Sequence, residues 1–145
     1  QLSQLYSNYY IIINEYNKIL KLRNEYLKKI NKKISVDKNY INILTGYLID
    51  KSIMIYKMRQ KYVDKINQYC NYIFKDIMKL SGFNIKYNKS FDFDLNMLNL
   101  KEYLMQKYQE KLDYDIKLCT TSIGPHKDDI EFYIGDKNLK NYVRN

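Results

Sequence analysis

The sequence contains no alanine and no tryptophan, and its 145 residues include one proline, four glycines, two cysteines and one histidine. The longest apolar run extends from Tyr9 to Ile13, far short of the roughly 18 residues that a membrane-spanning helix needs, so we exclude a transmembrane protein. Cys70 and Cys119 stand far apart and outside any CxxC spacing, which argues against a disulfide framework and a zinc site. A reducing compartment is therefore favoured.

The chain begins at Gln1 rather than at a methionine, and it has no succession of basic, apolar and small residues typical of a signal peptide. We interpret it as an internal fragment of an intracellular protein. Its length fits one structural unit that can bury about two thirds of the unfolded chain's surface.

The net charge is strongly positive, because 25 basic residues face 16 acidic ones, which gives +9. Such a balance favours an anionic partner such as nucleic acid. The abundance of Asn, Ile, Lys and Tyr is also typical of an AT-rich genome, so the lysine excess has a compositional explanation as well. The stretch from Lys18 to Lys38 holds eight basic and two acidic residues, and this contributes 8 − 2 = +6 of the total.

Two long helices are predicted in the first part of the chain. A heptad pattern from Leu2 to Ile34 predicts a core-facing helix of about thirty residues, and a second apolar stripe continues from Ile41 to Leu80. Asp37 is the expected N-cap of the second helix and Gly82 its expected C-cap. A short connection makes the pair an antiparallel hairpin. Arg23 and Arg59 interrupt the apolar stripes, so each is expected to find a carboxylate or a helix-end carbonyl.

The remainder predicts a small α+β base. Alternation at Phe83, Ile85 and Tyr87 indicates a strand, and a helix is expected from Asn99, with Glu102 in a capping box, to about Asp113. The final part reads as strand, turn and strand, with strands expected at 116–122 and 130–134 and a turn at 135–136. The predicted fold class is mostly α with a small β part, divided into a hairpin arm (1–82) and a base (83–145).

The densest polar cluster is Gly124, Pro125, His126, Lys127, Asp128 and Asp129. One histidine and two carboxylates could bind a divalent metal or perform acid–base chemistry. In an extended segment, however, successive side chains point to opposite faces, so a tight turn with His126 hydrogen-bonded locally is the simpler interpretation. The four glycines form neither GxxxxGK[ST] nor GxGxxG, so this chain by itself is not expected to bind a nucleotide or hydrolyse ATP.

The same cluster carries a family resemblance. The segment TTSIGPHKDDIEF, from Thr120 to Phe132, resembles the T-x-x-GPHRDD-hydrophobic signature of the RecF family of DNA repair ATPases. YNKILKLRNEYLK, from Tyr16 to Lys28, is similar to the family's Tyr-Asn-x-x-Leu-x-x-Arg-Asn-x-x-Leu-Lys segment. Arg59 also falls where the family has an Arg on its second long helix. Two departures are Lys127, in place of the commoner Arg, and Cys119, near a usual Gly.

The resemblance implies the helical arm of a bacterial, cytoplasmic ABC-type ATPase related to the heads of SMC proteins. Its P-loop, signature and second nucleotide motif would lie outside this chain, so no cofactor, metal or catalytic residue is expected here. The whole protein would bind ATP and Mg, form an ATP-dependent homodimer and bind DNA at single-strand gaps. It would act with RecR and RecO to help load RecA, and it would not contact a membrane.

The most basic place is the expected tip of the hairpin, which makes it a candidate contact for the DNA backbone through Lys28, Lys29, Lys32, Lys33 and Lys38. Tyr26 and Tyr40 could stack on exposed bases there or belong to the core. A second hypothesis is a helical protein–protein interaction module that contacts a mediator partner or dimer mate and no DNA, which the Tyr-rich helix faces favour. A third is an independent metal-dependent enzyme that uses His126 and Asp128.

Overall fold

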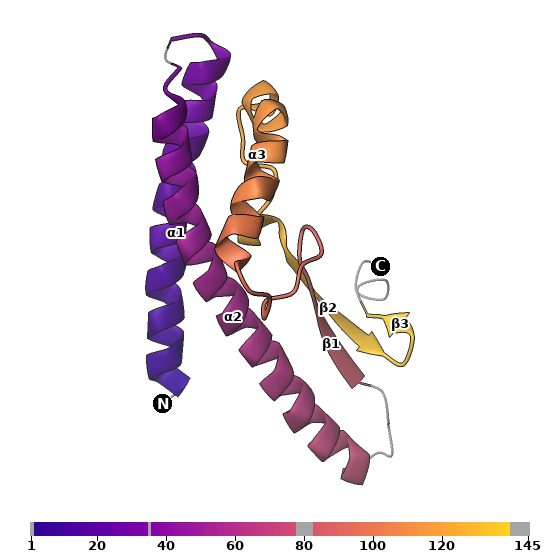
Figure 1. Cartoon of the computed structure of the whole chain (residues 1–145). Helices are drawn as coiled ribbons and strands as arrows, with labels where there is room; N and C mark the ends of the chain where they lie inside the picture. The colour runs from indigo at the N-terminus through magenta and orange to yellow at the C-terminus, as the bar shows by residue number, and fades with distance from the viewer. Residues whose placement is uncertain (1, 35, 78–82, 140–145) are drawn as a thin grey trace.

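A computed structural model describes residues 2–34, 36–77 and 83–139. The first two helices, α1 (Leu2–Asn31) and α2 (Lys38–Ile77), run antiparallel as a hairpin, as predicted. Figure 1 shows that they lie side by side near their connection and that α2 then diverges from α1. Within the described ranges, no helix is long and apolar enough to cross a membrane.

Local hydrogen bonds fix both ends of the hairpin connection. Lys33 adopts a left-handed conformation with φ of 58°, and the Ile34 N–H donates to the Lys29 carbonyl at 3.0 Å. This is a Schellman-type end of α1, at a position that glycine usually occupies. Asp37 Oδ1 then accepts the N–H of Asn39 at 3.0 Å, which confirms the predicted N-cap of α2. The C-cap expected at Gly82 lies outside the described residues.

The sheet has three antiparallel strands in the order β1 (Phe83–Asn88), β2 (Asp129–Ile134) and β3 (Lys137–Asn138). Residue Ile85 pairs with Phe132, so the apolar residues of β1 and β2 share one face. The strands predicted at 83–87 and 130–134 are confirmed. The side-chain amide of Asn67 on α2 holds β1 in place. Its Oδ1 accepts the Ile85 N–H at 2.7 Å, and its Nδ2 donates to the Ile85 carbonyl at 2.9 Å.

The third helix, α3 (Leu100–Leu118), corrects two sequence predictions. Asn99 is its N-cap residue, but it has φ of 60° and makes no side-chain capping bond, so the capping box with Glu102 is absent. The helix also continues five residues past Asp113, and the strand predicted at 116–122 is therefore wrong. The reason is tertiary: Ile116 packs on the hairpin core, so its apolar character belongs to a helix face.

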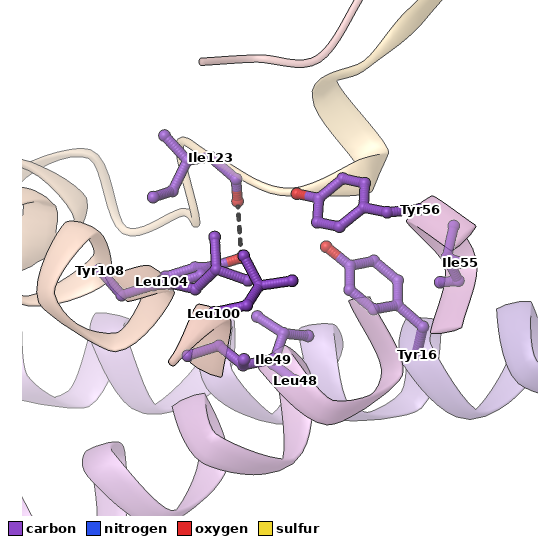
Figure 2. Packing of buried hydrophobic residues seen from close by; sticks show 9 residues of the cluster. All are labelled: Tyr16, Leu48, Ile49, Ile55, Tyr56, Leu100, Leu104, Tyr108 and Ile123. Carbon is purple, nitrogen blue, oxygen red and sulfur yellow. Dashed lines mark hydrogen bonds between the residues drawn. The ribbon is translucent and has the colours of Figure 1, made fainter. Parts of the chain in front are cut away.

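Two apolar clusters hold these elements together in a mostly helical α+β fold, as predicted. The larger cluster joins α1, α2 and α3 to the segment before β2, and Figure 2 shows its nine buried residues. The smaller cluster, near the hairpin connection, contains Tyr26, Leu27, Ile41 and Leu44. Tyr26 is only 7% exposed and packs edge-on against Tyr40 at 4.6 Å, so it is a core residue and does not offer its ring to a base.

The candidate site at the GPH turn and the basic hairpin tip

The GPHKDD segment folds as a short 3-10 turn, Pro125–Lys127, immediately before β2. A turn was predicted, but its hydrogen bonds reach far beyond the neighbouring residues. His126 Nε2 contacts the Thr121 carbonyl at 2.8 Å and Nδ1 contacts the Tyr16 hydroxyl of α1 at 2.7 Å. The local bond to Thr121 confirms part of the prediction, whereas the contact with Tyr16 spans 110 positions and was not predicted.

These contacts define the tautomer of the neutral His126 ring. A carbonyl only accepts hydrogen bonds, so Nε2 carries the proton and the Tyr16 hydroxyl donates to Nδ1. Burial lowers the pKa of His126, which also favours the neutral ring. Burial raises the pKa of Tyr16, so its hydroxyl keeps its proton for donation. Both ring nitrogens are thereby occupied, and neither is available as a metal ligand or a base.

Asp128 is the second anchor of the turn. Its Oδ1 accepts the Ser90 N–H at 2.7 Å, and its Oδ2 accepts the Tyr87 hydroxyl and lies 3.8 Å from Arg59 Nη1. Burial raises the pKa of this carboxyl, while the hydrogen bonds from Tyr87 and Ser90 and the charge of Arg59 act in the opposite direction. Asp128 therefore ties β2 to β1 and α2, with both oxygens engaged.

Arg59 joins the turn to both helices of the hairpin. Its Nη1 donates to the Pro125 carbonyl at 2.8 Å, and its Nε donates to the Tyr9 hydroxyl of α1 at the same distance. The prediction that Arg59 finds a carboxylate or a helix-end carbonyl is confirmed by Asp128. The carbonyl that Arg59 also binds belongs to Pro125, the first residue of the 3-10 turn, and was not predicted. The guanidinium therefore joins α1, α2 and the turn through direct contacts.

Gly124 is required by the space around the turn. It has φ of 127°, and a Cβ at this position would lie 2.7 Å from the Tyr16 Oη and 2.8 Å from the Tyr108 Oη. Neither tyrosine can retreat easily, because both are buried in the larger apolar cluster. Tyr108 also donates to the Ile123 carbonyl at 3.3 Å, the bond drawn in Figure 2. Only glycine fits between the two hydroxyls.

A second, fully buried polar cluster surrounds Arg23 of α1. Arg23 Nη1 donates to Asp115 Oδ2 of α3 at 3.1 Å and to Thr121 Oγ1 at 2.8 Å, and its Nε donates to Thr45 Oγ1 at 2.9 Å. The side chains of Arg23 and Asp115 are 1% and 0% exposed. This confirms the predicted carboxylate partner of Arg23. One nitrogen, Nη2, has no hydrogen-bond partner among the described residues.

The neighbouring Asn24 holds the same threonine from the other side. Its Oδ1 accepts the Thr121 N–H at 2.9 Å and the Thr121 hydroxyl at 2.7 Å, which leaves that hydroxyl oriented to accept from Arg23. Sequence reasoning named Tyr16 and Asn24 only as part of the resembling segment 16–28, without a partner for either, and it missed Asp115. The available signal was the placement of polar groups beside an apolar stripe, which indicates burial but does not identify a partner.

The contacts of Arg23, Arg59, His126 and Asp128 together form a structural lock between the hairpin and the base. The ring nitrogens of His126 and the carboxylate oxygens of Asp128 are all engaged in it, so neither side chain is free to bind a metal or to act as an acid or base. Asp129 is exposed on β2, away from the engaged carboxylate of Asp128, and Lys127 is exposed as well. In the described part of the chain, no group of three His, Cys, Asp or Glu side chains could hold a metal ion. Cys70 and Cys119 are both free thiols.

The lysines of the candidate DNA contact occupy a different place. Figure 1 shows the connection between α1 and α2 at the far end of the hairpin, whereas β1 and the turn before β2 lie against α2 away from that end, and β2 pairs with β1. All five side chains at this tip are exposed, and the described residues offer them no ion pair: Lys28, Lys29, Lys32, Lys33 and Lys38.

Comparisons with known proteins agree with this geometry. No family model matches the sequence. Curated proteins described as DNA replication and repair protein RecF do match: the one from Lactococcus lactis is 32% identical over 143 residues, and the one from Ligilactobacillus salivarius is 28% identical over 145. Each match covers 98% of this chain. A solved structure of the recombination mediator protein RecF–ATP in the RecFOR pathway superimposes with a TM-score of 0.81 at 27% identity over 94% of this chain.

This chain belongs to the RecF family. It spans 38% of the length of the Ligilactobacillus salivarius relative and 36% of the solved RecF–ATP chain. A second solved structure, of RecF–ATPrS, covers 97% of this chain with a TM-score of 0.83 at 26% identity. The family is one of DNA replication and repair proteins, and the solved relatives are complexes with ATP or ATPrS.

The fold explains why widely separated segments of this RecF-family chain carry the resemblance together. Arg23 and Asn24 of α1, and Arg59 of α2, all bind the segment that runs from Thr121 to Asp128. Cys119, near a usual Gly of the family, has φ of 57° and caps α3 in a left-handed conformation. The motif is therefore a set of mutual contacts between the hairpin and the base.

Proposed function

We propose that this chain is the arm domain of a RecF-family recombinational DNA repair ATPase, and that its hairpin (1–82) contacts DNA while its base (83–145) joins the ATPase lobe. The observation that carries the proposal is the charge at the hairpin tip. Residues 18–38 carry +6 of the net +9, and the five tip lysines make no ion pair with the described residues. Such unpaired cations release counterions when they meet phosphates, which drives nonspecific binding to DNA.

The local acidic groups do little to cancel this charge. Asp37 is engaged as the N-cap of α2 through the N–H groups of Asn39 and Tyr40, at 3.0 and 3.3 Å. Glu25 is the other acidic residue of this stretch. It lies one helical turn before Lys28 and Lys29 on α1, but it forms no ion pair with either of them in the described residues. The rigid packing of Tyr26 and Leu27 below the tip would present the lysines on a firm support.

The whole protein, in this proposal, binds ATP and Mg through motifs outside this chain, dimerises in an ATP-dependent manner and binds DNA at single-strand gaps. It would act in the bacterial cytoplasm with RecO and RecR to help load RecA. The lock around the GPH turn would transmit the position of the ATPase lobe to the arm, because Arg59 and Arg23 fasten the turn to both hairpin helices. A stiff connection of this kind is required if the arm is to follow the lobe.

The test is fluorescence anisotropy of this chain with gapped, duplex and single-stranded DNA over a salt series. Replacing Lys28, Lys29, Lys32 and Lys33 with Glu should weaken binding and reduce the slope of log K against log salt by about three to four on duplex. The control variant carries the same Lys→Glu change at four lysines of the sheet and α3, and its loss of affinity should be smaller: Lys86, Lys101, Lys111 and Lys137. Equal affinities for the tip variant and the unsubstituted chain at moderate salt would refute the contact at the tip.

A second candidate function is a protein-interaction arm, and exposed apolar side chains near the tip favour it. Ile34, Val36, Ile43 and Tyr47 are between 55% and 70% exposed, and they lie next to the lysines along the connection and the first turns of α2. Analytical ultracentrifugation distinguishes this function: a concentration-dependent dimer, together with no measurable DNA binding at low salt, would favour the interaction arm over the DNA contact.

A further inference from the structure

A second basic surface lies on α2, in the half that is remote from the hairpin tip. Lys57, Lys61 and Lys65 are exposed and follow one another at intervals of four residues, so they form one row along the helix with a spacing of about 6 Å. None of the three makes an ion pair with the described residues.

The row lines a surface groove whose opposite wall is the loop between β1 and α3. Leu95 and Asn96 form that wall, and amide side chains of Gln60 and Gln68 lie on the α2 side. One carboxylate also faces the groove, Asp64, and its Oδ1 accepts a hydrogen bond from Gln60 Nε2 at 2.9 Å. The charge lining the groove is therefore 3 − 1 = +2, and the remaining polar groups are side-chain amides, whose NH2 groups can donate to phosphate oxygens.

Two tyrosines extend this face toward the end of the described helix. Tyr72 follows Lys65 by seven residues, which is two helical turns, so it lies on the same face as the row. Tyr72 is 73% exposed and Tyr69 is 67% exposed. From Lys57 to Tyr72 the face is about 22 Å long. Lysines followed by bare aromatic rings are the combination that binds a phosphate backbone and stacks on unpaired bases.

We propose that this face of α2 (Lys57, Lys61, Lys65 and Tyr72) is a binding track for single-stranded nucleic acid, separate from the lysines at the hairpin tip. The ligand is a single strand because only unpaired bases offer their faces to a tyrosine ring, whereas a duplex presents phosphates and base edges. The track rests on the proposed function in one respect, namely that the chain binds DNA, and it uses none of the tip residues.

The experiment measures anisotropy of a labelled oligothymidylate with this chain over a salt series. Replacing Lys57, Lys61 and Lys65 with Gln should lower the affinity and reduce the salt slope by about two, since each lost contact with a single strand removes about 0.7. A control variant with the same loss of charge replaces Lys86, Lys111 and Lys137 with Gln. Its salt slope should differ from that of the unsubstituted chain by no more than about 0.35, which is half of one phosphate contact. Circular dichroism shows that each variant keeps its helix content.

The tyrosine is tested separately from the charges. Y72A should weaken binding about 5-fold to 100-fold with no change in the salt slope, because it removes stacking without removing a cation. Y72F keeps the ring and should bind like the unsubstituted chain. A duplex competitor of the same length should show no loss with Y72A, since it offers no base faces to stack on.

The outcomes separate this track from the tip. If the lysine row variant keeps the affinity and slope of its charge control, or if Y72A binds the oligothymidylate like Y72F, the track is refuted whatever the tip variant does. If both are weakened while the tip variant is unaffected, the track stands and the proposed contact at the tip fails. If the unsubstituted chain binds no DNA even at low salt, both proposals are refuted.

Discussion

The buried ion pair between Arg23 and Asp115 offers the sharpest test of how α1 and α3 are held together. We expect Asp115→Asn to destabilise the chain strongly, because Asn keeps the size of the side chain but removes the carboxylate with which the guanidinium pairs in the described residues. Oδ1 could still accept the Ser122 N–H, at 3.1 Å in the parent, so the loss comes mainly from the charge. Arg23 would then be buried with only the Thr45 and Thr121 hydroxyls as partners.

The size of the effect follows from burial. Both side chains are at most 1% exposed, so solvent cannot replace the lost partner. Removing one member of a buried pair costs about 3 to 5 kcal/mol, because a charge is left without compensation. For a chain of this size, 3 kcal/mol lowers the melting temperature by roughly 6 to 12 °C. Urea denaturation followed by circular dichroism measures the change in the free energy of unfolding directly.

The chain supplies a matched control for this substitution. Asp50 pairs with Lys101 at 2.7 Å, but the two side chains are 48% and 54% exposed, so Asp50→Asn should cost no more than about 1 kcal/mol. In a double-mutant cycle, Arg23→Met combined with Asp115→Asn should destabilise less than the sum of the single changes. A cost below 1 kcal/mol for Asp115→Asn, equal to that of the surface control, would show that the pair does not hold α1 to α3.

Two further predictions concern α3 and the turn. Cys119→Gly should stabilise the chain by about 0.5 to 1 kcal/mol, because Cys119 caps α3 with φ of 57°, a conformation that glycine adopts without strain. As a control, Cys70→Gly within α2 should destabilise the chain by about 1 kcal/mol. A loss of stability in Cys119→Gly, measured by urea denaturation, would contradict this account of the cap. Burial lowers the pKa of His126 in the folded chain, so on acidification the unfolded chain takes up a proton near pH 6.5 that the folded chain does not. The contribution of His126 to the free energy of unfolding is therefore fully present above pH 6.5 and is lost as the pH falls through the folded-state pKa. Unfolding measured between pH 7.5 and 5.5 should show this loss in the parent but not in His126→Gln, and identical pH profiles for the two chains would exclude the neutral, buried histidine.

Local patterns predicted the elements whose cause is local. The apolar repeats of α1 and α2 and the alternation at Ile85 and Phe132 are properties of neighbouring residues, and helix and strand geometry convert them directly into faces. The cap at Asp37 was predictable for the same reason, because its side chain binds the N–H groups two and three residues further on.

The two errors in α3 have different origins. Ile116 was assigned to a strand because its short segment partly alternates, but its packing on the hairpin core extends α3 to Leu118. Asn99 was expected to begin a capping box, yet it adopts φ of 60°, which positions no side-chain bond to the helix. At Ile116 the tertiary context outweighed the local preference, which differs between helix and strand by only fractions of a kcal/mol per residue. At Asn99 the left-handed conformation is one that Asn tolerates better than most residues.

The candidate sites divide in the same way. The sequence located the basic stretch and the GPH segment, and it showed that Arg23 and Arg59 needed partners, since a buried guanidinium without one is too costly. It could not name Asp115, Tyr16 or Tyr9, because hydrogen bonds across 50 to 110 positions leave no periodic trace in the sequence.

The sequence by itself thus determined the two long helices and the location of the positive charge, which depend on residues close together in the chain, and its quoted segments carried the family resemblance. Only the tertiary structure decided that the resembling segments meet in one lock, that Tyr26 belongs to the core, and that the lysine row of α2 shares a face with Tyr72. Those properties arise from packing, where side chains from distant elements exclude water and select one another by shape and hydrogen bonding.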